Sequence, residues 1–136
     1  FTWDFYFFHY PQKTEAIYGW QCGYKELSEY IENNYEKTDT FYITKKLGQP
    51  YIFTLFYTAY PPAEYQKQAK LTELGEYGFG EVERYDKFEF NFATPNATKT
   101  AVYVGYPDDF QGTNIPEQDI EKIKIYNDEI FWIYKP

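Results

Sequence analysis

The order of two hydrophobic periodicities constrains the fold of this chain more than any other feature. In the first half, apolar residues recur every three or four positions with Lys and Glu between them, which predicts an amphipathic helix over residues 20–35. In the second half the spacing falls to two, which is typical of strands. Helices early and strands late predict an α/β fold, a mixed β-sheet with flanking helices. The helical positions are Trp20, Tyr24, Leu27, Ile31 and Tyr35.

Two further helices are predicted before the strand-rich half. Pro50 suits the first turn of a helix because its missing N–H has no partner there, although a buried strand competes for the same run. The predicted helix from Pro50 places a set of apolar residues on one face, namely Ile52, Leu55, Phe56 and Ala59. A second helix is expected from Pro61-Pro62 to about Ala69, with Tyr65 and Ala69 inward.

Strands are predicted on both sides of these helices. Residues 41–44 form a short early strand, and residues 101–104 suit an interior strand. A hairpin is expected from 81–85 and 88–92 around Asp86-Lys87, and another from 120–126 and 130–134 around Asn127-Asp128. The chain between 106 and 109 is expected to be a loop.

Composition excludes one class of partner. The chain has 136 residues, which fits one domain, and a net charge of -8 with Arg84 as its one arginine. Nucleic-acid binding needs Lys and Arg to neutralise phosphates and bidentate Arg to recognise guanine, so we expect no nucleic-acid partner. The same charge disfavours direct binding to anionic lipid headgroups.

The first ten residues are dominated by aromatic side chains. Seven of them are Phe, Tyr or Trp, and the chain holds no methionine. Belts of Trp and Tyr occur where a chain leaves a bilayer, so the start is expected to be a cut just outside a membrane in a longer protein. Codon bias and core packing offer another explanation for the 24% aromatic content. No stretch approaches the roughly 18 to 20 apolar residues of a spanning helix, and no signal peptide is visible.

Few residues suggest catalysis. His9 and Cys22 are the only histidine and cysteine, so no internal disulfide can form, and they are a conceivable base and nucleophile. A buried, inert thiol is the favoured interpretation of Cys22. Asp108-Asp109 follow a predicted strand, where an open α/β sheet places ligands or cations, although such residues usually serve turns and helix starts. We therefore predict no catalytic residue, no metal site and no cofactor.

Three other patterns are weaker. The glycine-rich run at 75–80 fits neither the dinucleotide fingerprint nor the phosphate loop and is predicted to be a connector. Asn96-Ala97-Thr98 matches a glycosylation acceptor, a match that arises often by chance. Exposed aromatic residues could stack on sugar rings, and the predicted binding residues are Trp3, Tyr6, Tyr10 and Tyr18.

Three stretches resemble a known family. They are His9-Tyr10-Pro11, the run from Trp20-Gln21-Cys22-Gly23-Tyr24-Lys25-Glu26 to Ile31, and Gly48-Gln49-Pro50-Tyr51-Ile52-Phe53. Together with the order of the later hairpins, they resemble the soluble C-terminal region of polytopic membrane glycosyltransferases similar to protein mannosyltransferases and aminoarabinose transferases, which use lipid-linked sugars.

The resemblance implies a location and a partner rather than a catalytic residue. In that family the membrane-embedded part transfers the sugar, so this domain is expected to be non-catalytic. It would lie on the extracytoplasmic face of the cell membrane, against the transmembrane portion of its own parent chain and near a lipid-linked sugar or glycan. The alternatives are a free-standing carbohydrate-binding or protein-interaction module, and a small acidic hydrolase that uses Asp108, Asp109 or His9.

Overall fold

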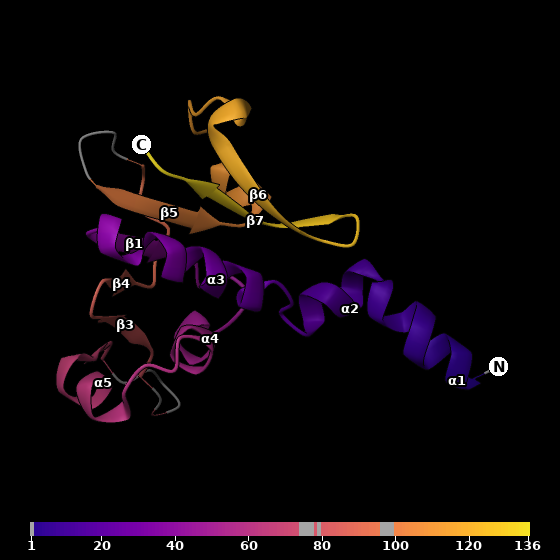
Figure 1. Cartoon of the computed structure of the whole chain (residues 1–136), viewed down its shortest axis with the longest axis horizontal. Helices are drawn as coiled ribbons and strands as arrows, with labels where there is room; N and C mark the ends of the chain where they lie inside the picture. The colour runs from indigo at the N-terminus through magenta and orange to yellow at the C-terminus, as the bar shows by residue number, and fades with distance from the viewer. Residues whose placement is uncertain (1, 74–77, 79, 96–99) are drawn as a thin grey trace.

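A mixed β-sheet forms the centre of the molecule. The structure, a computed structural model, describes residues 2–73, 78, 80–95 and 100–136. Within these residues the sheet has seven strands in the order β2-β3-β4-β1-β5-β7-β6 (Figure 1). β1 runs parallel to β4 and β5, and the other pairings are antiparallel. The predicted α/β class is confirmed. The strands are β1 Thr40–Ile43, β2 Lys70–Leu71, β3 Val82–Tyr85, β4 Phe88–Glu89, β5 Ala101–Gly105, β6 Ile120–Ile125 and β7 Asp128–Tyr134.

The α-helices precede most of the strands. They are α1 Thr2–Asp4, α2 Thr14–Gly19, α3 Tyr24–Asn34, α4 Pro50–Tyr57 and α5 Pro62–Gln68. A π-helical turn at Phe5–His9 and a 3-10 turn at Tyr10–Gln12 join α1 to α2. Further 3-10 turns lie at Tyr35–Lys37, Pro107–Phe110 and Glu117–Asp119. No helix within the described ranges is both long enough and apolar enough to cross a bilayer.

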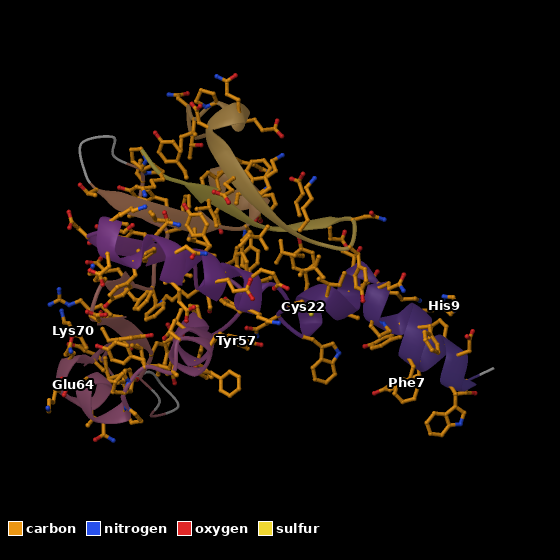
Figure 2. The ribbon with its side chains drawn as sticks, in the orientation of Figure 1. Phe7, His9, Cys22, Tyr57, Glu64 and Lys70 are labelled. Carbon is orange, nitrogen blue, oxygen red and sulfur yellow. The ribbon has the colours of Figure 1, made fainter. Side chains whose placement is uncertain are left out.

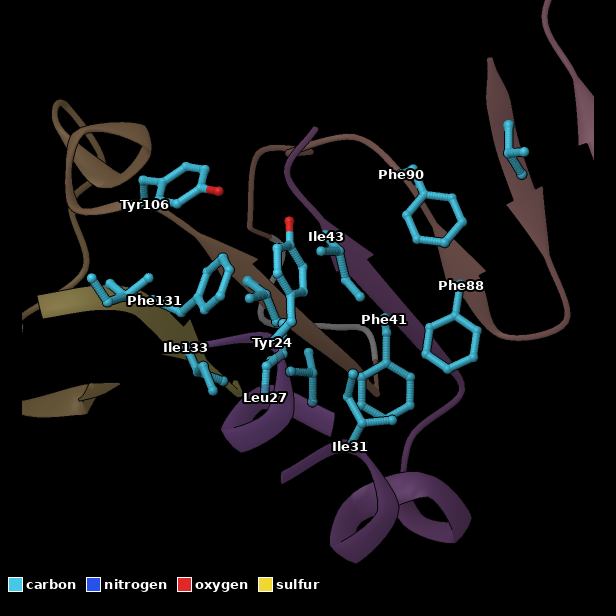
Figure 3. Packing of buried hydrophobic residues seen from close by; sticks show 14 of the residues in the cluster. Tyr24, Leu27, Ile31, Phe41, Ile43, Phe88, Phe90, Tyr106, Phe131 and Ile133 are labelled. Atoms are coloured by element: carbon cyan, nitrogen blue, oxygen red, sulfur yellow. The ribbon is translucent and has the colours of Figure 1, made fainter. Parts of the chain in front are cut away.

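The main core lies between α3 and the sheet. Figure 3 shows Tyr24, Leu27 and Ile31 of α3 facing side chains of the central strands, such as Phe41 and Phe131. Burying these apolar groups removes them from water, which is the main favourable contribution to folding. The predicted inward positions of this helix at 24, 27 and 31 are confirmed.

Alternate residues of the central strands face the opposite side of the sheet. Tyr42 of β1 and Tyr103 of β5 form a second buried cluster with Ala101, packed against Phe92. Because β5 is buried on both faces, it has a continuous apolar sequence rather than an alternating one. The predicted interior strand at 101–104 is confirmed.

The start of the main helix differs from the prediction. The helix begins at Tyr24 and not at Trp20, whose side chain is 73% exposed. Gln21 and Gly23 have φ values of 51° and 99°, in the left-handed region that no α-helix uses. Apolar spacing does not reveal left-handed backbone conformations, so it could not show that these two residues separate Trp20 from the helix.

The helix predicted from Pro50 is confirmed, but only Leu55 of its predicted apolar face packs against the core. Ile52 and Phe56 are 50% and 74% exposed, whereas Pro50 and Thr54 are buried. Thr54 is buried because its hydroxyl is satisfied: the Tyr85 hydroxyl donates to Thr54 Oγ1 at 2.8 Å, and Thr54 Oγ1 donates to the Tyr51 carbonyl at 3.0 Å. In α5, Tyr65 and Ala69 pack partly buried against the core, as predicted.

Both predicted hairpins are present with shifted ends. β3 and β4 flank the expected Asp86-Lys87 turn, but β4 ends at Glu89 rather than at residue 92. The second turn lies at Tyr126-Asn127, and β7 already begins at Asp128. Tyr126 adopts φ 53°, which completes the tight reversal one residue earlier than predicted.

The N-terminal segment, defined here as residues 2–13, projects from the body of the molecule (Figure 1). Every residue of it is exposed. The following helix, α2, is attached to the β6–β7 hairpin: Thr14 Oγ1 donates to the Asp128 carboxylate at 3.1 Å, and the Tyr18 hydroxyl donates to the Glu129 carbonyl at 3.1 Å. Attachment of the chain to the core therefore begins at α2.

Candidate functional site

A candidate binding site lies at the carboxyl ends of β1 and β5. These strands are parallel neighbours, and the Thr44 N–H extends their ladder by donating to the Val104 carbonyl at 2.9 Å. From β1 the chain continues to β2, β3 and β4 on one side of the sheet, whereas from β5 it continues to β6 and β7 on the other side. Open α/β sheets bind ligands outside such a switch in strand order, because the two connections diverge and leave a crevice.

The crevice is an open cavity of about 390 Å³. The loop after β1 supplies one wall, the 3-10 turn after β5 supplies another, and α2 closes the side with Tyr18. The cavity combines flat apolar surfaces with a few polar groups, which is the usual composition of a small-molecule site. The lining residues are Tyr18, Lys46, Leu47, Tyr106, Pro107, Asp108 and Gln111.

An ion pair spans the two loops at the cavity. Lys46 Nζ donates to Asp108 Oδ2, and this hydrogen bond lowers the pKa of Asp108 and raises the pKa of Lys46. Asp109 Oδ2 accepts from the Tyr106 N–H at 2.9 Å, which closes the 3-10 turn at Pro107–Phe110. The structure places the predicted acidic pair at the expected strand end, where one carboxylate pairs with a lysine and the other caps a turn.

Two tyrosines form the aromatic part of the cavity. Tyr18 and Tyr106 have ring centroids 6.2 Å apart. Burial raises the pKa of both phenols, so both stay neutral at physiological pH. The Tyr18 hydroxyl donates to the Glu129 carbonyl and can still accept a hydrogen bond from a ligand. The Tyr106 hydroxyl, in contrast, is hydrogen-bonded to Tyr24. A neutral hydrogen-bond acceptor beside apolar ring faces suits a polyhydroxylated, uncharged ligand better than an anion.

The cavity does not supply the parts of a catalytic centre. Its described lining contains no histidine, cysteine or serine, and Asp108 is held as a carboxylate rather than as an acid. Over the part of the chain that the structure describes, no group of three or more His, Cys, Asp or Glu side chains is placed to hold a metal ion. The arrangement is suited to binding rather than to proton transfer.

His9 and Cys22 lie in different surroundings. Figure 2 shows His9 on the projecting N-terminal segment and Cys22 near the start of α3. His9 Nε2 is 3.2 Å from Asp4 Oδ2, and Cys22 is a free, partly buried thiol packed against the core. The structure therefore brings His9 together neither with Cys22 nor with Asp108, and the predicted hydrolase residues do not converge.

Three of the predicted sugar-binding aromatics lie on the N-terminal segment. Trp3 stacks on Phe7 at 5.5 Å with an interplanar angle of 6°, and Tyr6 stacks on Tyr10 at 6.0 Å with an angle of 3°. Tyr18 lies apart from them, in the wall of the cavity. The four residues thus belong to two separate surfaces.

Sequence reasoning missed five residues of the cavity, namely Lys46, Leu47, Tyr106, Pro107 and Gln111. Lys46 and Leu47 directly follow a predicted strand, so the strand-end rule that singled out Asp108 could have found them as well. Two predicted features fall outside the described residues: most of the glycine-rich run, at 75–77 and 79, and the Asn96-Ala97-Thr98 acceptor.

Comparison of the chain with protein-family models, with curated proteins and with solved structures found no match.

Proposed function

We propose that this chain is a non-catalytic domain on the extracytoplasmic face of a membrane glycosyltransferase that uses lipid-linked sugars. Its N-terminal segment would adjoin the membrane and the transmembrane portion of the parent chain, and its cavity would assist recognition of the acceptor or the sugar. One observation carries this proposal: the N-terminal segment is helical and rich in aromatic residues, yet none of it is buried.

Such a segment needs support from outside the domain. Isolated helices shorter than about 12 to 15 residues are marginal in water, and aromatic residues are only moderate helix formers. Phe5, Tyr6, Phe7 and Phe8 are consecutive and all exposed, so they point to different sides of the helical segment. A protein partner would cover one side, whereas a membrane interface can surround the whole segment. Trp and Tyr are also the residues enriched at that depth.

The charged residues of the N-terminal segment are compatible with a membrane interface. Asp4 and His9 lie within 3.2 Å of each other and can neutralise each other when the histidine is protonated. Lys13 Nζ lies 5.0 Å from the centroid of the Phe5 ring. Long lysine side chains commonly extend from apolar surroundings toward the headgroups, so Lys13 suits the boundary between membrane and domain.

The complete reading frame would test the proposal. We expect several hydrophobic spans on the amino-terminal side of Phe1, each of about 20 apolar residues. Membranes that contain the complete protein should transfer a labelled sugar from a lipid-linked donor. A frame without such spans, or membranes without any transfer, would contradict the proposal.

A cavity variant separates recognition from catalysis in the same assay. Gln111→Ala removes a polar group from the cavity wall and should raise KM by roughly 5- to 10-fold, the loss of about one neutral hydrogen bond, with kcat unchanged. Gln12→Ala is a matched control, since Gln12 does not line the cavity and, among the described residues, donates to the Phe8 carbonyl of its own segment. Equal effects of the two substitutions would exclude the cavity from recognition.

A free-standing carbohydrate-binding module is the second candidate. The parallel Trp3–Phe7 and Tyr6–Tyr10 pairs favour it, because the exposed faces of aromatic rings can stack on pyranose rings. Titration with soluble glycans should then change the emission of Trp3, and Trp3→Ala should abolish binding. No response to free or lipid-linked sugars would eliminate this function.

A further inference from the structure

We propose that a second surface, the α4 face, also rests on the bilayer and fixes the tilt of the domain. The inference deepens the membrane-proximal location proposed above and depends on it, but not on the identity of the sugar. The α4 face comprises Trp20, Leu47, Ile52, Phe56 and Tyr57, all of which are exposed.

The α4 helix is apolar on both sides. Its inward side packs Phe53 and Leu55 against the core beside the buried Thr54, while Ile52 and Phe56, one helical turn apart, face outward. A helix at a water-exposed surface normally carries charged or polar residues on its outer side. Here the outer side has the composition of the inner side, so water is not the surrounding that it suits best.

Charge also distinguishes this region. No charged residue stands between Lys46 and Glu64, in a chain of which 25% of residues are charged. The α4 face therefore offers neither ion pairs to a charged partner nor attraction to anionic headgroups. Because the whole chain carries a net charge of -8, the fitting occupant is the interface of a zwitterionic bilayer, bound through apolar burial.

The α4 face is continuous with the chain that leads to the N-terminal segment. Gln21, the neighbour of Trp20, lies against Gly48, the neighbour of Leu47: a Cβ on Gly48 would stand 2.7 Å from Gln21 Nε2. The rings of Tyr24 and Phe53 stack at 4.3 Å, which joins α3 to α4. Figure 1 likewise places α4 near the end of α3 that adjoins α2.

The size of the α4 face favours a bilayer over a second copy of the chain. Its five side chains expose on the order of 500 Å², since a fully exposed aromatic side chain offers roughly 150–250 Å². A stable protein interface buries about 800 Å² on each partner. A bilayer contact can be smaller, because the N-terminal segment already holds the domain beside the membrane and makes the second contact intramolecular.

Quenching of Trp20 by brominated lipids would test the α4 face. The chain is tethered through an N-terminal histidine tag to phosphatidylcholine vesicles that contain a chelating lipid, with bromine on the acyl chains. Trp3→Phe and Trp132→Phe leave Trp20 as the only tryptophan. We expect brominated vesicles to lower Trp20 emission at least about twofold relative to ordinary vesicles. A matched chain that keeps only Trp132, of β7, should keep its emission.

Substitutions in the α4 face separate the outcomes. Ile52→Glu with Phe56→Glu should restore Trp20 emission while the chain stays tethered. Circular dichroism shows whether this acidic pair disturbs folding. If it does, Ile52→Ser with Phe56→Ser takes its place and should restore the emission in the same way. The inference is overturned if Trp20 is not quenched on tethering, or if these substitutions leave quenching unchanged. A dimer in sedimentation that the substitutions dissociate, without lipid quenching, would assign the face to a second copy. None of these results alters the sugar-transfer test of the proposed function.

Discussion

At the scale of single residues, the hydroxyl groups of Tyr85 and Thr54 can be buried because they are each other's hydrogen-bond partners. Tyr85 is 1% exposed, and its hydroxyl donates to Thr54, which is fully buried in α4. The bond joins the β3–β4 hairpin to a helix that apolar spacing alone would orient differently. Leaving either hydroxyl unpaired in the core would cost about 1 to 3 kcal/mol.

Tyr85→Phe tests this bond and its pH dependence. At pH 7 the substitution should lower the free energy of unfolding by about 1 kcal/mol. Burial raises the pKa of the Tyr85 phenol in the folded state, so its contribution is complete below the unfolded pKa of about 10 and is lost as pH rises. Urea unfolding of both proteins should show the difference shrinking above pH 10. A constant difference up to pH 11 would contradict the assignment.

Asp108→Asn tests the ion pair of the cavity. The hydrogen bond from Lys46 lowers the pKa of Asp108, so the pair stabilises the fold above the unfolded pKa of about 3.9 and loses that effect as pH falls. As pH is lowered below about 4, the thermal unfolding midpoint of the wild-type protein should therefore fall more steeply than that of the variant. Because both side chains are half exposed, the difference should be small and should diminish in high salt. Parallel curves would show that the pair contributes nothing.

At the scale of elements, the packing of α3 on the sheet depends on the backbone conformation of the residue just before it. Gly23 precedes Tyr24 with φ 99°, and a Cβ there would lie 3.1 Å from Ile130 Cγ2 and 3.3 Å from Phe131 Cδ2. The left-handed geometry lets the backbone turn onto the sheet while α2 stays attached to the β6–β7 hairpin. Glycine is the residue that adopts it without strain.

A pair of glycine substitutions measures this requirement. Gly23→Ala should destabilise the protein by about 1 to 3 kcal/mol, through strain and the contact with β7. Gly19→Ala is the control, since nothing lies within 4 Å of a Cβ there, and it should be neutral or stabilising by up to about 1 kcal/mol. Denaturant midpoints that move equally would refute the role given to Gly23.

Elements could be predicted where one local pattern determines them. The spacing of Tyr24, Leu27 and Ile31 and the alternation of Phe88 and Phe90 each reflect burial against the same core, so they are visible in the sequence. The residue at which α3 begins could not be predicted, because it depends on the backbone conformation of Gln21 and Gly23. The inward face of α4 depends on a bond to Tyr85, which lies far away in the chain.

The candidate site was predictable only in part for the same reason. Asp108 and Tyr18 were singled out from different arguments, a strand end and an exposed aromatic residue. Their meeting in one cavity requires that β1 and β5 be parallel neighbours and that α2 attach to the β6–β7 hairpin. Both are long-range facts of the tertiary structure.

At the scale of the whole molecule, the structure separates a packed body from a projection. The body holds the mixed sheet, its helices and a cavity with aromatic walls, while the N-terminal segment holds exposed aromatic residues that none of the described residues covers. This division is the reason to assign the segment to a membrane interface and the cavity to recognition. The membrane interface is central to the proposal, because the proposed location of the cavity beside lipid-linked sugars depends on it.

The fluorescence emission of Trp3, measured when the chain is mixed with vesicles without any tether, tests the membrane assignment most directly. With Trp20→Phe and Trp132→Phe, Trp3 is the only tryptophan, and it is 77% exposed in the structure. We predict that phosphatidylcholine vesicles shift its emission to shorter wavelength and that lipids brominated near the headgroup quench it. Phe7→Ser with Phe8→Ser should weaken vesicle binding by at least about tenfold, given roughly 1.5 to 3 kcal/mol for each buried aromatic side chain. Trp3 emission that is the same in buffer, ordinary vesicles and brominated vesicles would contradict the account.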